Sequence, residues 1–109
     1  MDVEDFIVEG YTRFPPGKYD DECVTDLFQK TIRDDMGNKL YFITVERWDY
    51  SSVAQERNIP ISYNFSVQFN LKKGGTTQVD CFSEFDIESA EDFYNNLWNT
   101  GWFLPYEEI

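Results

Sequence analysis

Carboxylates are the side chains in this sequence whose type and number could most readily do chemistry. The chain holds 21 Asp and Glu residues, and three adjacent pairs stand out: Asp20-Asp21, Asp34-Asp35 and Glu91-Asp92. Oxygen ligands of this kind bind Mg²⁺ and Ca²⁺, so pairs from separate segments could assemble a divalent-metal site. Their spacing follows no metal-binding motif, and adjacent carboxylates more often lie on a solvated surface. A carboxylate-dependent metal enzyme is therefore an alternative and not the leading prediction.

Other catalytic chemistry finds little support in the residue types present. The chain contains no histidine, and its two cysteines, Cys23 and Cys81, have no CxxC partner. It has no glycine-rich phosphate loop, nucleophile elbow or EF-hand loop. Both cysteines fall on the apolar side of their predicted elements, which favours small buried thiols. We therefore expect no enzymatic activity and no cofactor.

The excess of acidic over basic residues points instead to binding. The 21 acidic residues stand against 9 Lys and Arg, which gives a formal net charge of -12. A charge this large attracts basic partners. Because 41% of the residues are hydrophobic and 18% are aromatic, the chain can still fold around a core. With no basic leader and no apolar run of about 20 residues, we expect one cytoplasmic domain spanning residues 1–109.

The clearest element among those that position these side chains is a strand from Ile61 to Leu71. Apolar and polar residues alternate along it, which predicts one face on the core and one in water. The segment from Thr76 to Phe85 is its predicted hairpin partner. A three-residue loop, Lys73-Gly74-Gly75, would place Leu71 opposite Thr77 and bring the apolar rows of both strands together.

Two more strands and two helices complete the predicted fold. The strands are expected at Asp5–Phe14 and Lys39–Tyr50. Helical spacing predicts a first helix from about Glu22 to Asp35, and a second that Ser89 caps and Gly101 ends. The resulting order, β-α-β-β-β-α, predicts an α+β fold in which an antiparallel sheet of three or four strands carries both helices on one face.

Acidic residues at the start of a helix need no function, because the helix dipole favours negative charge there. Asp34 and Asp35 do not fit this explanation, since they would lie at the C-terminal end of the first predicted helix, where the dipole favours cations. Charges that folding does not require indicate function, so we predict that both contact a partner. A solvated helix end is the alternative.

A second group of acidic residues forms an even-numbered row: Asp80, Glu84, Asp86 and Glu88. If the strand from Thr76 extends that far, side chains two residues apart lie about 6.6 Å from one another on its outer face. Such a regular line of negative charge can imitate a nucleic-acid backbone. The same alternation is found on any polar outward strand face, so a solvated surface remains the alternative.

Aromatic residues supply a third group of candidates. Trp48 and Tyr50 lie on one face of a predicted strand, and Trp102, Phe103 and Tyr106 follow the second helix. Aromatic anchors ringed by acidic residues are typical of protein-binding hot spots, so we predict that Trp48, Tyr50 and Trp102 contact a partner. Alternatively, Trp102 and Phe103 close one end of the core.

These features together predict a small acidic, non-enzymatic protein that occupies a basic surface of a nuclease or other nucleic-acid-binding protein. An inhibitor or nucleic-acid mimic of the phage anti-defence type, such as an anti-CRISPR or anti-restriction protein, would act in this way. The alternative is an interaction module, such as a toxin-immunity or phage accessory protein, that binds through its aromatic residues. Binding to nucleic acid or to membranes is not expected, because phosphate groups and anionic lipids repel negative charge.

Overall fold

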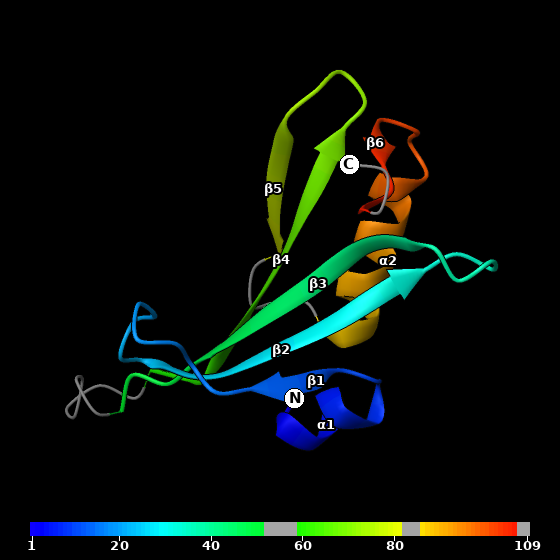
Figure 1. The fold of residues 1–109 in the computed structure, drawn as a ribbon. Coiled ribbons are helices and arrows are strands. Elements are labelled where there is room, and N and C mark those ends of the chain that lie inside the picture. The colour runs from blue at the N-terminus through cyan, green and yellow to red at the C-terminus, as the bar shows by residue number, and fades with distance from the viewer. Residues whose placement is uncertain (52–58, 82–85, 107–109) are drawn as a thin grey trace.

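The computed structural model describes residues 1–51, 59–81 and 86–106, and it has an α+β fold (Figure 1). Its elements are α1 (Val3–Val8), β1 (Thr12–Phe14), β2 (Val24–Arg33), β3 (Lys39–Trp48), β4 (Ser62–Leu71), β5 (Thr76–Cys81), α2 (Ile87–Trp98) and β6 (Phe103–Leu104). The six strands form one antiparallel sheet in the order β1-β2-β3-β4-β5, and β6 also pairs with β4. The α+β class is confirmed, whereas the sheet has more strands than predicted and the element order differs.

Two neighbouring rows of residues across the sheet show which face is buried. The first row pairs one residue from each of five strands: Arg13, Phe28, Val45, Phe65 and Cys81. Every member after Arg13 is buried. The next row points to the opposite face, because side chains alternate along a strand. It consists of Thr12, Gln29, Thr44, Ser66 and Asp80.

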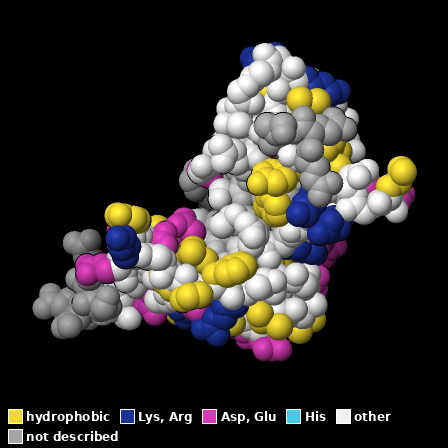
Figure 2. All heavy atoms as spheres, in the orientation of Figure 1, with side chains coloured by type: hydrophobic (Ala, Val, Ile, Leu, Met, Phe, Trp, Pro, Cys, Tyr) yellow, Lys and Arg dark blue, Asp and Glu magenta, His cyan; other side chains and the backbone are white. Residues whose placement is uncertain are grey.

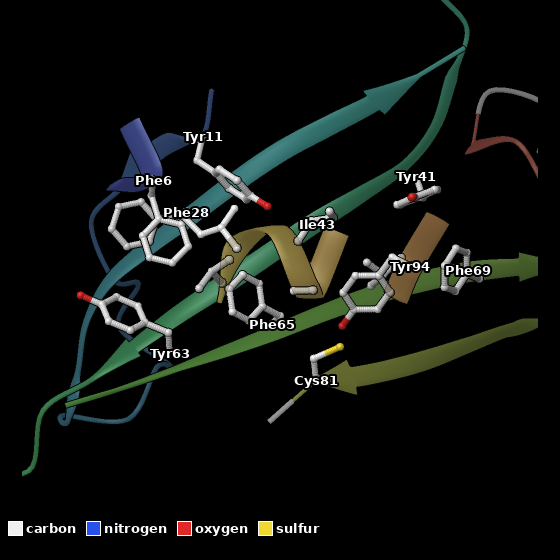
Figure 3. Close-up of a cluster of buried hydrophobic side chains, with 14 of the residues drawn as sticks. Phe6, Tyr11, Phe28, Tyr41, Ile43, Tyr63, Phe65, Phe69, Cys81 and Tyr94 are labelled. Carbon is white, nitrogen blue, oxygen red and sulfur yellow. The ribbon is translucent and has the colours of Figure 1, made fainter. Parts of the chain in front are cut away.

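Both helices contribute to the buried face of the sheet (Figure 3). Phe6 of α1 is fully buried and stacks on Phe28 of β2, with ring centroids 4.7 Å apart. Tyr94 of α2 is also fully buried, and its hydroxyl donates a hydrogen bond of 2.8 Å to the backbone carbonyl of Val79. Removing such large apolar surfaces from water is the main force that holds the helices on the sheet.

The sheet divides into two arms beyond its centre. β3 pairs with β4 only from Thr44 to Trp48, and the rest of β3 diverges from β4 (Figure 1). On the edge of β4 that β3 leaves, β6 takes its place. Aromatic rings pack between the arms: Phe69 of β4 lies 5.1 Å from Tyr41 of β3 and 4.3 Å from Phe103 of β6, between centroids.

The predicted helix from Glu22 to Asp35 is wrong, because this segment contains strand β2. Val24, Phe28 and Ile32 recur every four residues. This spacing fits a helix, and it also fits a strand, because residues an even number of positions apart lie on the same strand face. The inward positions between them hold Asp26 and Lys30, whose charges concealed the alternation of a strand. Each of these two charges is paired in the folded protein, as described below.

The predicted first strand, Asp5–Phe14, is also largely wrong. Its start belongs to α1, and only Thr12–Phe14 is a strand. The side chain of Asp2 accepts a hydrogen bond from the Asp5 backbone N–H at 3.0 Å, and the Asp5 side chain accepts one from the Asp2 N–H at 2.8 Å. This reciprocal capping box stabilises the start of a helix.

The β4–β5 hairpin has the predicted pairing of apolar rows but a different register. Thr77 lies opposite Phe69 and not Leu71, so the strands are shifted by two residues. Gly74 and Gly75 both have positive φ, of 102° and 78°. They allow the chain to turn directly after Leu71, whose backbone N–H donates a hydrogen bond to the Gly75 carbonyl at 2.9 Å.

The ends of the remaining elements differ modestly from the predictions. β5 ends at Cys81, and residues 82–85 of its predicted extension lie outside the described part of the chain. α2 begins before Ser89, since Asp86 is its N-cap, while Gly101 has the predicted left-handed conformation with φ of 82°. Within the described residues, neither helix is long and apolar enough to cross a membrane.

An acidic groove between the two helices

A groove of about 410 Å³ lies between α1 and the start of α2. Its apolar lining comes from Met1, Val8 and Ile87. The rest of the lining consists of six acidic residues: Asp5, Glu9, Asp86, Glu88, Glu91 and Asp92. No lysine or arginine is among the described residues that line it. We call this hollow the acidic groove.

Local helix chemistry places several of these carboxylates. Asp5 completes the capping box of α1, and the Asp86 side chain accepts a hydrogen bond of 2.8 Å from the Ser89 backbone N–H. That hydrogen bond lowers the pKa of Asp86 below its ordinary value. Glu88 lies in the first turn of α2, where the helix dipole favours negative charge. The requirements of two helix starts therefore gather negative charge in one place.

Glu91 is held at the base of the groove by two side chains from other elements. Lys30 of β2 donates to Glu91 Oε1 at 2.6 Å, and the Tyr11 hydroxyl donates to the same oxygen at 3.3 Å. Lys30 Nζ also lies 5.4 Å from the centroid of the Tyr11 ring. Burial, followed by the nearby charge of Glu91, raises the pKa of Tyr11. Tyr11 therefore stays protonated and serves as a donor.

Three carboxylates of the acidic groove remain available to a ligand. Glu9, Glu88 and Asp92 are exposed, and their side chains form no hydrogen bond or salt bridge with any residue that the structure describes. Unpaired carboxylates beside apolar side chains attract a cation that also carries apolar surface, such as a Lys or Arg side chain. Among the described residues, no group of three or more carboxylate, Cys or His side chains is arranged to hold a metal ion.

Asp34 and Asp35 lie in the turn between β2 and β3 and not at a helix end. The Asp34 carboxylate accepts hydrogen bonds of 2.9 Å from the backbone N–H groups of Met36 and Asn38, and one of 3.0 Å from Asn38 Nδ2. These bonds lower its pKa. The argument that folding does not require Asp34 is therefore wrong. Its contact with a partner, like that of Asp35, stays a prediction.

The predicted acidic row does not continue along one strand. Asp80 lies on the outer face of β5, whereas Asp86 and Glu88 belong to the start of α2 and line the acidic groove. Glu84 lies outside the described residues. The premise of a straight line of charge is thus wrong for Asp86 and Glu88, although the structure brings these two close to other carboxylates.

The aromatic candidates fall in separate places. Trp48 and Tyr50 are half-buried and stack on each other with ring centroids 5.7 Å apart. Trp102 is 64% exposed and lines a separate hollow of about 320 Å³ with Leu71, Lys72 and Lys73. Phe103 is buried in the core, as the alternative for it predicted. The structure therefore leaves Trp102 as the most exposed of the three predicted aromatic contacts.

The two cysteines and the charges of β2 serve the interior. Cys23 and Cys81 are both free and buried, as predicted, and burial raises the pKa of each thiol. Asp26 is only 7% exposed and accepts a hydrogen bond of 2.6 Å from Arg13 Nε. Arg47 Nη1 lies 3.9 Å from the other Asp26 oxygen. These inward charges are paired, which is the usual condition for burying them.

Sequence reasoning missed Asp5, Glu9, Glu91 and Asp92 as members of one site. The first two were assigned to a strand, and the last pair was treated as solvated surface. The Asp2 and Asp5 spacing, an acceptor followed three residues later by an acidic side chain, was the signal for a helix start. Comparison with known proteins gives no match to any protein-family model, curated protein or solved structure.

Proposed function

We propose that this protein is a small acidic binding protein whose acidic groove receives a basic segment of a partner protein. The observation that carries the proposal is the convergence of six acidic residues on one hollow that Met1, Val8 and Ile87 also line. Three of them, Glu9, Glu88 and Asp92, have no hydrogen-bonded or ionic side-chain partner among the described residues. Lys and Arg side chains match such a groove, because their stems are apolar and their ends are charged.

The partner class that fits this chemistry is a nuclease or another nucleic-acid-binding protein. Such proteins present clustered Lys and Arg side chains that normally contact phosphates. Blocking that surface would make this chain an inhibitor of the anti-defence type. The carboxylates of the groove come from two helices and their caps rather than from one strand, so the mimicry lies in the density of negative charge and not in a regular row.

A salt series tests the proposal directly. The protein is titrated into a basic nuclease and, separately, into a fluorescent peptide rich in Lys and Arg, at increasing NaCl concentration. We expect the affinity to fall steadily with salt, since screening weakens charge-driven association. An acidic nuclease of similar size serves as the control and should not bind. An absence of binding to the basic probes, or an affinity that salt leaves unchanged, would overturn the proposal.

The exposed ring of Trp102 supports a second candidate, the interaction module. Trp102 directly precedes β6, and Lys72 and Lys73 lie in the turn between β4 and β5. Their hollow shares no lining residue with the acidic groove. Exposed Trp side chains are enriched in binding hot spots. In this alternative, charge only steers the encounter, and affinity depends on Trp102 more than on Glu88 or Asp92.

A further inference from the structure

The two edges of the sheet differ in how open they are to a further strand. β1, at one edge, has only three residues, and Pro15 and Pro16 follow it directly. A short edge strand next to residues without an N–H group resists pairing. β5, at the other edge, has six residues without proline or lysine, and its pairing with β4 has no register shift. No strand among the described residues pairs with its free side, and Figure 1 shows β5 at the margin of its arm.

The hydrogen-bond register shows which backbone groups of β5 point to its free side. The Leu71 N–H donates to the Gly75 carbonyl, so Gly75 directs its backbone towards β4. In an antiparallel pair this direction alternates from one residue to the next, so the odd-numbered residues of β5 pair with β4. The even-numbered residues direct their N–H and C=O groups to the free side: Thr76, Gln78 and Asp80. Within the described part of the chain, these outward groups have no backbone partner.

A small acidic hollow lies beside this edge, on the face of the sheet opposite the core. Its volume is about 140 Å³, and Glu46 of β3 and Asp80 of β5 line it together with Asn64 and Ser66 of β4. Glu46 is half-buried and forms no hydrogen bond or ion pair with any described residue. The Asp80 carboxylate accepts a hydrogen bond of 3.0 Å from Gln78 Nε2. No described Lys or Arg lines the hollow, so its carboxylates favour a cationic side chain from elsewhere.

On the buried side, the same edge leaves part of the core uncovered. Val79 packs against the core but is only half-buried, and so is Thr77. An apolar side chain on an added strand would lie beside Val79 and remove further apolar surface from water. Because side chains alternate between the two faces of a strand, the segment that fits this edge alternates apolar with polar or basic residues.

We propose that the free edge of β5 binds an extended segment of a partner protein as an added antiparallel strand. The backbone of the segment pairs with the outward groups of Gln78 and its even-numbered neighbours. A Lys or Arg side chain opposite Asp80 reaches the hollow that Glu46 lines, and apolar residues face Val79. In this mode of recognition the main-chain hydrogen bonds provide affinity, and the alternate side chains provide specificity.

The charges around the edge set the position of the basic residue in the segment. Lys72 and Lys73 lie in the turn before β5 and repel a cation near Thr76, so the basic residue belongs at the Asp80 end. Figure 2 views the outer face, and dark blue appears near the tip of the β4–β5 hairpin. No residue of β5 lines the acidic groove, so this contact is separate from the proposed function and does not depend on it.

Hydrogen exchange measured by NMR, with and without a peptide, tests the added strand. The probe is the peptide Val-Arg-Val-Thr-Val-Thr with blocked ends, whose arginine lies opposite Asp80 in the antiparallel register. We expect the bound peptide to slow the exchange of the Gln78 and Asp80 amides at least tenfold, because both become hydrogen-bonded. The Val79 amide already pairs with β4 and should change far less.

Two N-methylated forms of the peptide are matched controls. A methyl group on the amide of the fourth residue, which faces Gln78, removes a pairing N–H and should weaken binding at least tenfold. A methyl group on the amide of the fifth residue points away from β5 and should change the affinity by less than about twofold. Binding of the arginine in the acidic groove depends on neither amide, so the comparison distinguishes the two sites.

Charge-neutral variants test the contribution of the hollow. Glu46→Gln/Asp80→Asn should bind the peptide at least threefold more weakly, because the arginine loses both carboxylates. Glu4→Gln/Glu22→Gln removes the same charge at exposed residues that do not line the hollow, and it should bind like the wild type.

Two results would overturn the added strand. One is unchanged exchange of the Gln78 and Asp80 amides in the presence of millimolar peptide. The other is equal affinity of the two methylated peptides. The acidic groove is tested separately by the salt series, whose outcome neither result affects.

Discussion

Lys30 Nζ lies 2.6 Å from Glu91 Oε1, and this contact joins the second strand of the sheet to the second helix. About three quarters of each side chain is shielded from water, with exposures of 26% and 23%. The pair connects folding to the proposed function, because Glu91 also lines the acidic groove. Lys30 neutralises the carboxylate at the base, while the exposed carboxylates around it stay free to attract a cation.

Replacing Lys30 with Met should destabilise the protein by about 1 to 2 kcal/mol. This range lies between those for exposed and buried ion pairs, because the variant leaves Glu91 partly buried without its cation. Lys30→Met combined with Glu91→Gln should recover part of the loss, since no unpaired charge remains. Urea unfolding of the two variants and the wild type measures both effects. Equal losses in the single and double variants would show that the ion pair is not the cause.

Replacing Tyr94 with Phe should cost about 1 kcal/mol of unfolding free energy. The ring remains in the core, but the Val79 carbonyl loses its 2.8 Å hydrogen bond from the Tyr94 hydroxyl. Tyr19→Phe is the matched control, because Tyr19 is 91% exposed, and it should leave stability unchanged. Urea unfolding measures the stability of both variants, and the slope of the unfolding free energy against urea concentration should stay unchanged. A Tyr94→Phe variant as stable as the wild type contradicts the role assigned to this bond.

Acid should destabilise the fold through Asp34 and Asp86, whose pKa values are lowered from an ordinary 3.8 by hydrogen bonds to their carboxylates. A carboxylate with a lowered folded-state pKa contributes stability above its unfolded-state pKa, and this contribution is lost as the pH falls through the folded-state pKa. We therefore expect unfolding free energies to decline below about pH 4. The Asp34→Asn/Asp86→Asn variant should show a shallower decline in the same titration. An equally steep decline would assign the acid sensitivity to other groups.

Replacing Trp102 with Ala should change stability by less than about 0.5 kcal/mol, because the ring is 64% exposed. Trp48→Ala should cost more, since Trp48 is half-buried and stacks on Tyr50. Thermal unfolding compares the two. If Trp102→Ala then abolishes binding to a basic nuclease while retaining its fold, the interaction module becomes the better account.

The sequence was most informative where one face of an element is uniformly apolar. In β4, every inward residue from Tyr63 to Phe69 is buried, and the alternation predicted that strand correctly. In β2, two inward positions hold Asp26 and Lys30, whose partners come from distant segments. No local pattern reveals such partners, so the strand resembled a helix.

The site was predictable only in part for the same reason. Asp86 and Glu88 were correctly singled out as candidates, but as members of a strand. The contribution of Asp5 and Glu9 depends on how α1 packs beside α2, which is a tertiary relationship. Helix-capping spacing could have located α1, but not the groove that it forms.

The central claim is that the acidic groove binds a basic partner, and charge reversal at its rim tests this most directly. Glu88→Lys/Asp92→Lys is compared with Glu4→Lys/Glu22→Lys, which changes the net charge equally at exposed residues outside the groove. Binding to a basic nuclease and to a Lys- and Arg-rich peptide is measured by isothermal titration calorimetry. At about 0.7 kcal/mol for each lost ion pair, the groove variant should bind about tenfold more weakly than the control. Equal affinities of the two variants would contradict the account.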